Sequence, residues 1–138
     1  MKNFILILSS ILILGCDSNN EGIRYGTFDL YENDSIVGTI YRINNYQIEK
    51  YLDNSELIAR IDYQSDSTYL INGIEETQIG IDSIVWLTTY KEIGKNKYKI
   101  IVKPNNSSTA YQYEATLVKI ENKTPKMYSE KLDSLNHQ

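Results

Sequence analysis

Among the residues that could carry chemistry, the one cysteine, Cys16, stands in the most distinctive context. It follows an apolar run over residues 4–14 that only two serines interrupt, and a polar stretch begins just after it. Lys2 lies ahead of the run and the small residue Gly15 follows it, which is the arrangement of a secretory signal peptide. The run is shorter than the roughly 20 apolar residues of a membrane-spanning helix. We therefore predict that residues 1–15 are a signal peptide.

The sequence ILGC at residues 13–16 resembles the lipobox of bacterial lipoproteins. The resemblance implies cleavage after Gly15 and a thioether-linked diacylglycerol on Cys16, commonly with a further acyl chain such as palmitate on the new amino terminus. Two or three acyl chains hold a protein at a membrane stably, whereas one chain is marginal. We expect a lipoprotein of the bacterial cell envelope, anchored through Cys16 on the periplasmic or the surface face of a membrane. The alternative is an ordinary signal peptide with a chance cysteine.

The other reactive residue types are poorly arranged for catalysis. The only histidine, His137, is one residue from the end of the chain, so no serine in the body of the protein has a histidine base. No Gly-x-Ser-x-Gly elbow occurs, although a Ser–Lys pair stays open. Carboxylates such as Asp29, Glu49 and Asp62 fall on strand faces that we expect to be solvated. We predict no catalytic residue and no enzymatic activity.

Metal and cofactor sites have equally little support. The lone cysteine and histidine cannot build a zinc site. Oxygen-only calcium binding is conceivable at DNSE, residues 53–56, or SDS, residues 65–67, but neither segment matches an EF-hand loop. We interpret both segments as hairpin turns, and we expect no metal and no cofactor.

Charge argues against nucleic acid as a partner. The chain has 14 Lys and Arg against 18 Asp and Glu, and removal of residues 1–15 takes away one base, Lys2. The mature chain would then have a net charge of −5. Binding to phosphates depends on clustered basic side chains, which an acidic domain of this size lacks. We expect the partners to be the membrane, through the lipid on Cys16, and a small apolar ligand or an envelope protein.

The body of the chain is predicted to form a series of β-strands. It is rich in Ile, Tyr and Thr, and apolar residues alternate with polar ones, for example in ELIARIDYQS at residues 56–65. Clusters of Asn, Asp, Ser and Gly separate the runs at short intervals and favour turns. The predicted strands lie at about 24–31, 36–43, 46–52, 56–64, 68–74, 79–93, 97–103 and 109–120. The long sixth strand would be bent or bulged.

Consecutive strands joined by tight turns form an antiparallel meander, and closure removes its exposed edges. We therefore predict one all-β domain over residues 24–120, an up-and-down eight-stranded barrel; a β-sandwich and an open sheet closed by the tail are the alternatives. Residues 16–23 would be the lipidated tether, and residues 121–138 a polar tail that is either a short helix or disordered. Eight strands enclose just enough room for packed side chains or one small ligand.

The stretch from YGTFDLY, residues 25–31, to YEATLVKI, residues 113–120, resembles the lipocalin-like lipoproteins of bacteria. Gly26, Thr27 and Phe28 occupy the place where lipocalins carry Gly-x-Trp. The resemblance implies a lipocalin-like barrel. The stretch also resembles short exported proteins with a GTF opening, some of which bear the label of DNA topoisomerase IV. The acidic charge and the lack of a Gly-rich phosphate loop argue against that activity.

Aromatic residues are the best candidates for a ligand site. Tyr63, Trp86, Tyr111 and Tyr113 fall on faces that we expect to point inward, as do Tyr46 and Tyr98. Such an interior could grip a small hydrophobic ligand, or the rings could simply fill the barrel.

Arg42 shares a face with Ile36 and Ile40, which would point it inward toward an acid, but we favour a place near the rim.

The alternative function is a protein-interaction module, an inhibitor or an accessory subunit, that binds through loops such as GIEETQIG, residues 73–80.

Overall fold

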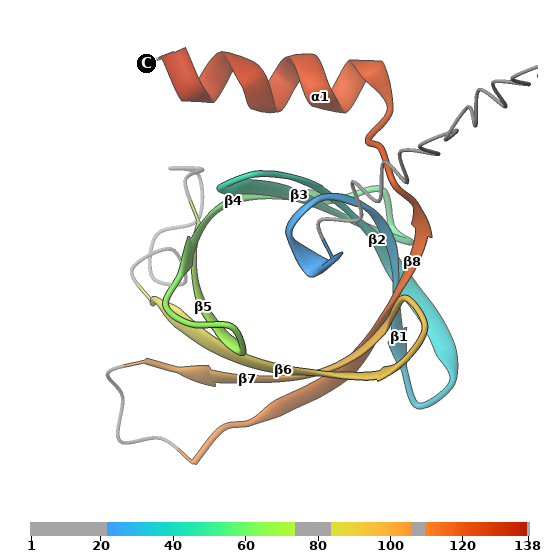
Figure 1. The fold of residues 1–138 in the computed structure, drawn as a ribbon, viewed down its shortest axis with the longest axis vertical. Helices are drawn as coiled ribbons and strands as arrows, with labels where there is room; N and C mark the ends of the chain where they lie inside the picture. Colours follow the sequence, from blue (N-terminus) through green and yellow to red (C-terminus); the bar gives the residue numbers. More distant parts are fainter. Residues whose placement is uncertain (1–21, 74–83, 106–109, 138) are drawn as a thin grey trace, which may run out of the picture.

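The computed structural model describes residues 22–73, 84–105 and 110–137, and it is a closed up-and-down barrel. Each strand pairs antiparallel with its neighbour in sequence, and the last strand pairs with the first (Figure 1). The strands are β1 (Gly26–Glu32), β2 (Ser35–Ile43), β3 (Tyr46–Tyr51), β4 (Glu56–Tyr63), β5 (Thr68–Gly73), β6 (Trp86–Gly94), β7 (Lys97–Pro104) and β8 (Tyr113–Glu121). The predicted all-β barrel is confirmed.

Tight turns occur where the polar clusters predicted them. Asn33, Asp34, Asn44, Asn54 and Asn96 all have positive φ, a conformation that Asn and Asp tolerate better than other residues with side chains. In the turn between β3 and β4 the Asp53 carboxylate accepts a hydrogen bond of 2.9 Å from the Ser55 backbone N–H. The local sequence therefore fixes the hairpins, and DNSE is an ordinary turn in the structure.

Two strands are shorter than predicted. The sixth strand was expected from residue 79, but β6 begins at Trp86; residues 84–85 are not strand, and 79–83 lie outside the described residues. The eighth was expected from residue 109, but β8 begins at Tyr113. Pairing of β7 with β8 ends at Val102, and the N–H of Asn105 donates instead to the Val85 carbonyl at 2.8 Å. Residues 110–112 consequently have no partner strand.

One end of the barrel is closed by the 3-10 turn η1 (Gly22–Arg24), which overlaps the end of the predicted tether, residues 16–23, and the first residue of the predicted barrel domain. Figure 1 shows this blue segment across the interior of the ring, and Ile23 is only 3% exposed. Lys119 of β8 donates to the Gly22 carbonyl at 3.0 Å and lies over the Phe28 ring. The opposite end, called the wide end below, is where β1, β3, β5 and β7 end and where β2, β4, β6 and β8 begin.

A short helix, α1 (Lys126–Asp133), followed by the 3-10 turn η2 (Ser134–His137), lies within the predicted tail. It packs on the outside of the barrel along β2 and β3 (Figure 1). Tyr128 stacks on Tyr41 with 4.1 Å between ring centroids, and Leu132 is fully buried in a cluster that includes Ile48 and Ile58. Within the described ranges, no helix has the length and apolar character needed to span a membrane.

Candidate functional site

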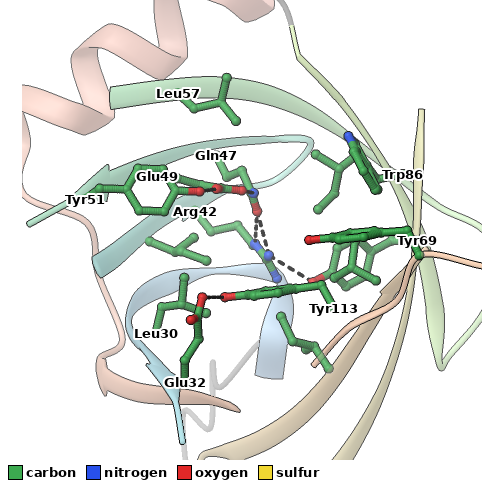
Figure 2. A pocket seen from close by; sticks show the side chains of 15 residues that line it. Leu30, Glu32, Arg42, Gln47, Glu49, Tyr51, Leu57, Tyr69, Trp86 and Tyr113 are labelled. Atoms are coloured by element: carbon green, nitrogen blue, oxygen red, sulfur yellow. Dashed lines mark hydrogen bonds between the residues drawn. The ribbon is translucent and has the colours of Figure 1, made fainter. Parts of the chain in front are cut away.

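A cavity of about 300 Å³ occupies the interior toward the wide end (Figure 2). Its apolar walls are aliphatic side chains from five strands, namely Leu30, Ile40, Leu57, Ile71, Ile100 and Val102. Aromatic rings add Tyr51, Tyr69, Trp86, Tyr111 and Tyr113, and the polar groups are Glu32, Arg42, Gln47 and Glu49. A concave, mostly apolar space with a few convergent polar groups is the usual form of a small-molecule site.

The structure brings three of the four predicted ligand residues together. Trp86, Tyr111 and Tyr113 all line the cavity, and the Trp86 and Tyr111 rings meet edge to face at 5.8 Å. The Tyr113 hydroxyl donates a hydrogen bond to the Glu32 carboxylate. Tyr111 precedes β8 instead of lying within it, and it is 55% exposed. It therefore contributes an edge of the cavity, where a fully inward ring was expected.

Tyr63, the fourth predicted residue, does not line this cavity. It sits near the closed end, where it packs edge to face on Tyr69 at 5.7 Å and the Arg24 guanidinium lies 4.4 Å from its ring centroid. Among the described residues, nothing forms a hydrogen bond with its buried hydroxyl. Tyr98 points inward, as predicted, against Phe28.

Tyr46 was predicted to point inward, and that prediction is wrong. Its ring packs on the outer cluster beneath α1, because Gln47, Glu49 and Tyr51 supply the inner face of β3. The loop segment proposed for protein interaction, 73–80, lies outside the described residues except for Gly73.

Arg42 was expected near the rim, and the structure instead buries it completely. Its Nη1 donates to the Ile23 carbonyl at 2.7 Å, while Nε and Nη2 both donate to Gln47 Oε1, at 3.1 and 2.6 Å. Nη2 also donates to the Tyr69 hydroxyl at 3.3 Å. These contacts satisfy the guanidinium at the base of the cavity and tie η1 to the barrel wall.

Glu49 was expected on a solvated face and lies instead in the cavity wall. Gln47 Nε2 donates to its Oε1 at 2.5 Å, and the Tyr51 hydroxyl donates to its Oε2. Figure 2 shows the resulting chain from Arg42 through Gln47 to Glu49 and Tyr51. Burial raises the pKa of Glu49, against the opposing effects of the Tyr51 hydroxyl, the Arg42 charge and the Gln47 amide.

Comparison with protein-family models, with curated proteins and with solved structures gives no match to this chain. The features that bear on its function are therefore the cavity and the lipobox-like segment at residues 13–16. The cavity holds hydrogen-bonded polar groups on the strands of a closed barrel, an arrangement suited to binding.

The raised pKa of Glu49 predicts a pH-dependent stability. The unfolded chain releases the Glu49 proton near its ordinary pKa of 4.5, whereas the folded chain holds it to higher pH. The stabilising contribution is therefore complete below that value and is lost as pH rises through the folded pKa. Relative to the variant Glu49→Gln, the wild type should lose free energy of unfolding as pH rises from about 4 to 8.

Urea unfolding at successive pH values, followed by the fluorescence of Trp86, measures this difference. The matched control is Glu92→Gln, because Glu92 is exposed on β6. A gap between wild type and Glu49→Gln that stays constant across this pH range would show that burial does not perturb Glu49.

Proposed function

We propose that this protein is a lipid-anchored protein of the bacterial cell envelope whose barrel binds one small, largely apolar ligand, without catalysing a reaction. The observation that carries the proposal is the cavity of about 300 Å³, which reaches the lower end of the size range of ligand sites. Its walls combine aliphatic side chains and aromatic rings, and its polar groups extend from Arg42 and Gln47 at the base to Glu32 at the wide end. A closed barrel keeps these groups in place, so little ordering is needed when a ligand binds.

Anchoring through Cys16 would orient the cavity. Cys16 lies outside the described residues, and the chain from it to Gly22 spans at most about 20 Å when fully extended. Gly22 begins the turn that closes one end of the barrel, whereas the cavity lies toward the other end. The lipid would thus hold the closed end near the membrane and leave the wide end facing the aqueous side, where a ligand could enter.

A binding titration tests the proposal. Trp86 is the only tryptophan and lines the cavity, so a ligand that enters should change its fluorescence in a saturable way. The neutral probe 1-naphthylmethanol offers an aromatic body small enough for the space. The variant Val102→Phe should weaken its binding at least about tenfold, because the larger ring fills the cavity that Val102 lines.

The matched control is Ile101→Phe, since neighbouring residues on a strand point to opposite faces. This variant should bind the probe as the wild type does. Equal binding by Val102→Phe would refute an internal ligand site, as would failure of the wild type to bind the naphthyl body in either a neutral or a charged form.

A further inference from the structure

We infer that the cavity selects organic cations: ligands with an apolar body and one ammonium group. The inference rests on the proposed function and adds the chemistry of the ligand. Its basis is the distribution of charge and of hydrogen-bonding capacity over the cavity wall, which has two carboxylates and one guanidinium among its lining residues.

The two carboxylates face the cavity with acceptor capacity to spare. Once ionised, Glu49 accepts one hydrogen bond on each oxygen, from Gln47 and from Tyr51, and each carboxylate oxygen can accept a second. Glu32 accepts from the Tyr113 hydroxyl through Oε1. Within the described part of the chain, neither carboxylate is in a salt bridge. The tyrosine hydroxyls beside them donate to the carboxylates and offer an incoming anion no proton.

The cation among the described lining residues, Arg42, is already committed to the protein. Arg42 donates to the Gln47 amide oxygen, to the Ile23 carbonyl and to Tyr69, and Gln47 stands between it and Glu49 (Figure 2). A ligand carboxylate would have to displace these buried contacts and would also approach Glu32 and Glu49. Unpaired like charges in a partly desolvated site are costly. The arrangement therefore disfavours anionic ligands such as fatty acids.

Aromatic faces near the carboxylates favour the opposite charge. Trp86, Tyr111 and Tyr113 line the wide-end part of the cavity, and Tyr113 is the hydrogen-bond partner of Glu32. A cation over such rings is attracted by their π-electrons, most strongly by tryptophan. An ammonium group near Glu32 would thus find an acceptor and aromatic walls together, while its apolar body occupies the aliphatic part of the cavity.

Three probes with one apolar body test this selection on the full chain: 1-naphthylmethylammonium, 1-naphthylmethanol and 1-naphthoate. We expect the ammonium to bind at least about tenfold more tightly than the alcohol, and the carboxylate at least about tenfold more weakly. Fluorescence of Trp86 reports all three titrations. Ammonium binding no tighter than alcohol binding would overturn the inference and leave the proposed function standing, whereas binding by none of the three would refute both.

Variants locate the selecting groups. Glu32→Gln should reduce the ratio of ammonium to alcohol affinity by about tenfold, because it removes a charge while retaining an acceptor. Glu114→Gln is the matched control, since Glu114 lies on β8 beside Tyr113 with its side chain 51% exposed. An unchanged ratio in Glu32→Gln, with alcohol binding intact, would overturn the role of this carboxylate. The three-probe comparison on the wild type needs no variant to fold.

Discussion

Replacement of Arg42 by methionine is expected to lower the free energy of unfolding by about 3–5 kcal/mol, the cost of removing one partner from a buried charged network. Methionine has a similar length and no charge. The substitution would leave the Gln47 amide oxygen and the Ile23 carbonyl without their donors in a region where Arg42 is 0% exposed. It would also remove the nearest positive charge from Glu49. The barrel should unfold at much lower urea concentration than the wild type.

The matched control for this experiment is Arg60→Met. Arg60 lies on β4 with its side chain exposed, so its loss should change the free energy of unfolding by at most about 0.5 kcal/mol. The double variant of Arg42→Met and Glu49→Gln should recover part of the lost stability, because the uncompensated carboxylate is then absent. Equal effects of Arg42→Met and Arg60→Met in urea unfolding would show that the buried network contributes nothing specific to the fold.

The architecture could be predicted because local signals along the chain agree with one another. Alternating apolar residues mark the strands, and Asn or Asp at the turns accepts the left-handed backbone that tight hairpins need. Most connections are tight turns that join antiparallel neighbours, so the meander follows. The largest differences are at the beginnings of β6 and β8, where the available pairing partner sets the limit of the strand. The Asn105 N–H turns to Val85, a choice that no local pattern reveals.

The polar half of the site was missed because alternation identifies two faces of a strand without saying which one is inside. In β3, Gln47 and Glu49 alternate with Tyr46 and Ile48, which suggests a polar outer face. The helix α1 reverses that assignment, because it covers the outside of β3 and buries Ile48 there. The apolar residues therefore serve the helix, and the polar ones enter the barrel. The same helix accounts for Ile58, which interrupts the alternation of β4.

The alternation of apolar and polar residues also could not show how far along the barrel axis each inward side chain lies. Leu57 and Tyr63 share one face of β4, yet six residues separate them by about 20 Å along the strand. Leu57 consequently lines the cavity at the wide end, whereas Tyr63 packs near the closed end. Trp86, Tyr111 and Tyr113 were grouped successfully because all three lie where strands meet the wide end.

Replacement of Cys16 by serine is expected to move the protein from the membrane fraction to the soluble fraction almost completely, or to leave an uncleaved precursor. Thioether formation requires the thiol, and serine offers no equivalent nucleophile for the lipid transfer that the lipobox resemblance implies. Each buried methylene of an acyl chain contributes about 0.8 kcal/mol to membrane binding, so loss of two or three chains removes the anchor. Fractionation of a bacterial host fed an alkyne-labelled fatty acid measures both location and lipid content.

Two variants in the same segment test whether the thiol has to be at residue 16 or only has to be present nearby. Ser18→Ala changes a neighbouring polar residue and should leave labelling and membrane retention unchanged. The double variant of Cys16→Ser and Ser18→Cys keeps one thiol but places it two residues after the required position, so it should behave as Cys16→Ser does. Labelling of this double variant, or membrane retention of Cys16→Ser after its signal peptide has been cleaved, would mean that something other than a lipid on residue 16 holds the barrel at the membrane. The orientation proposed for the cavity would then lose its basis, while the selection of cations by Glu32 and Glu49 would still stand on its own measurements.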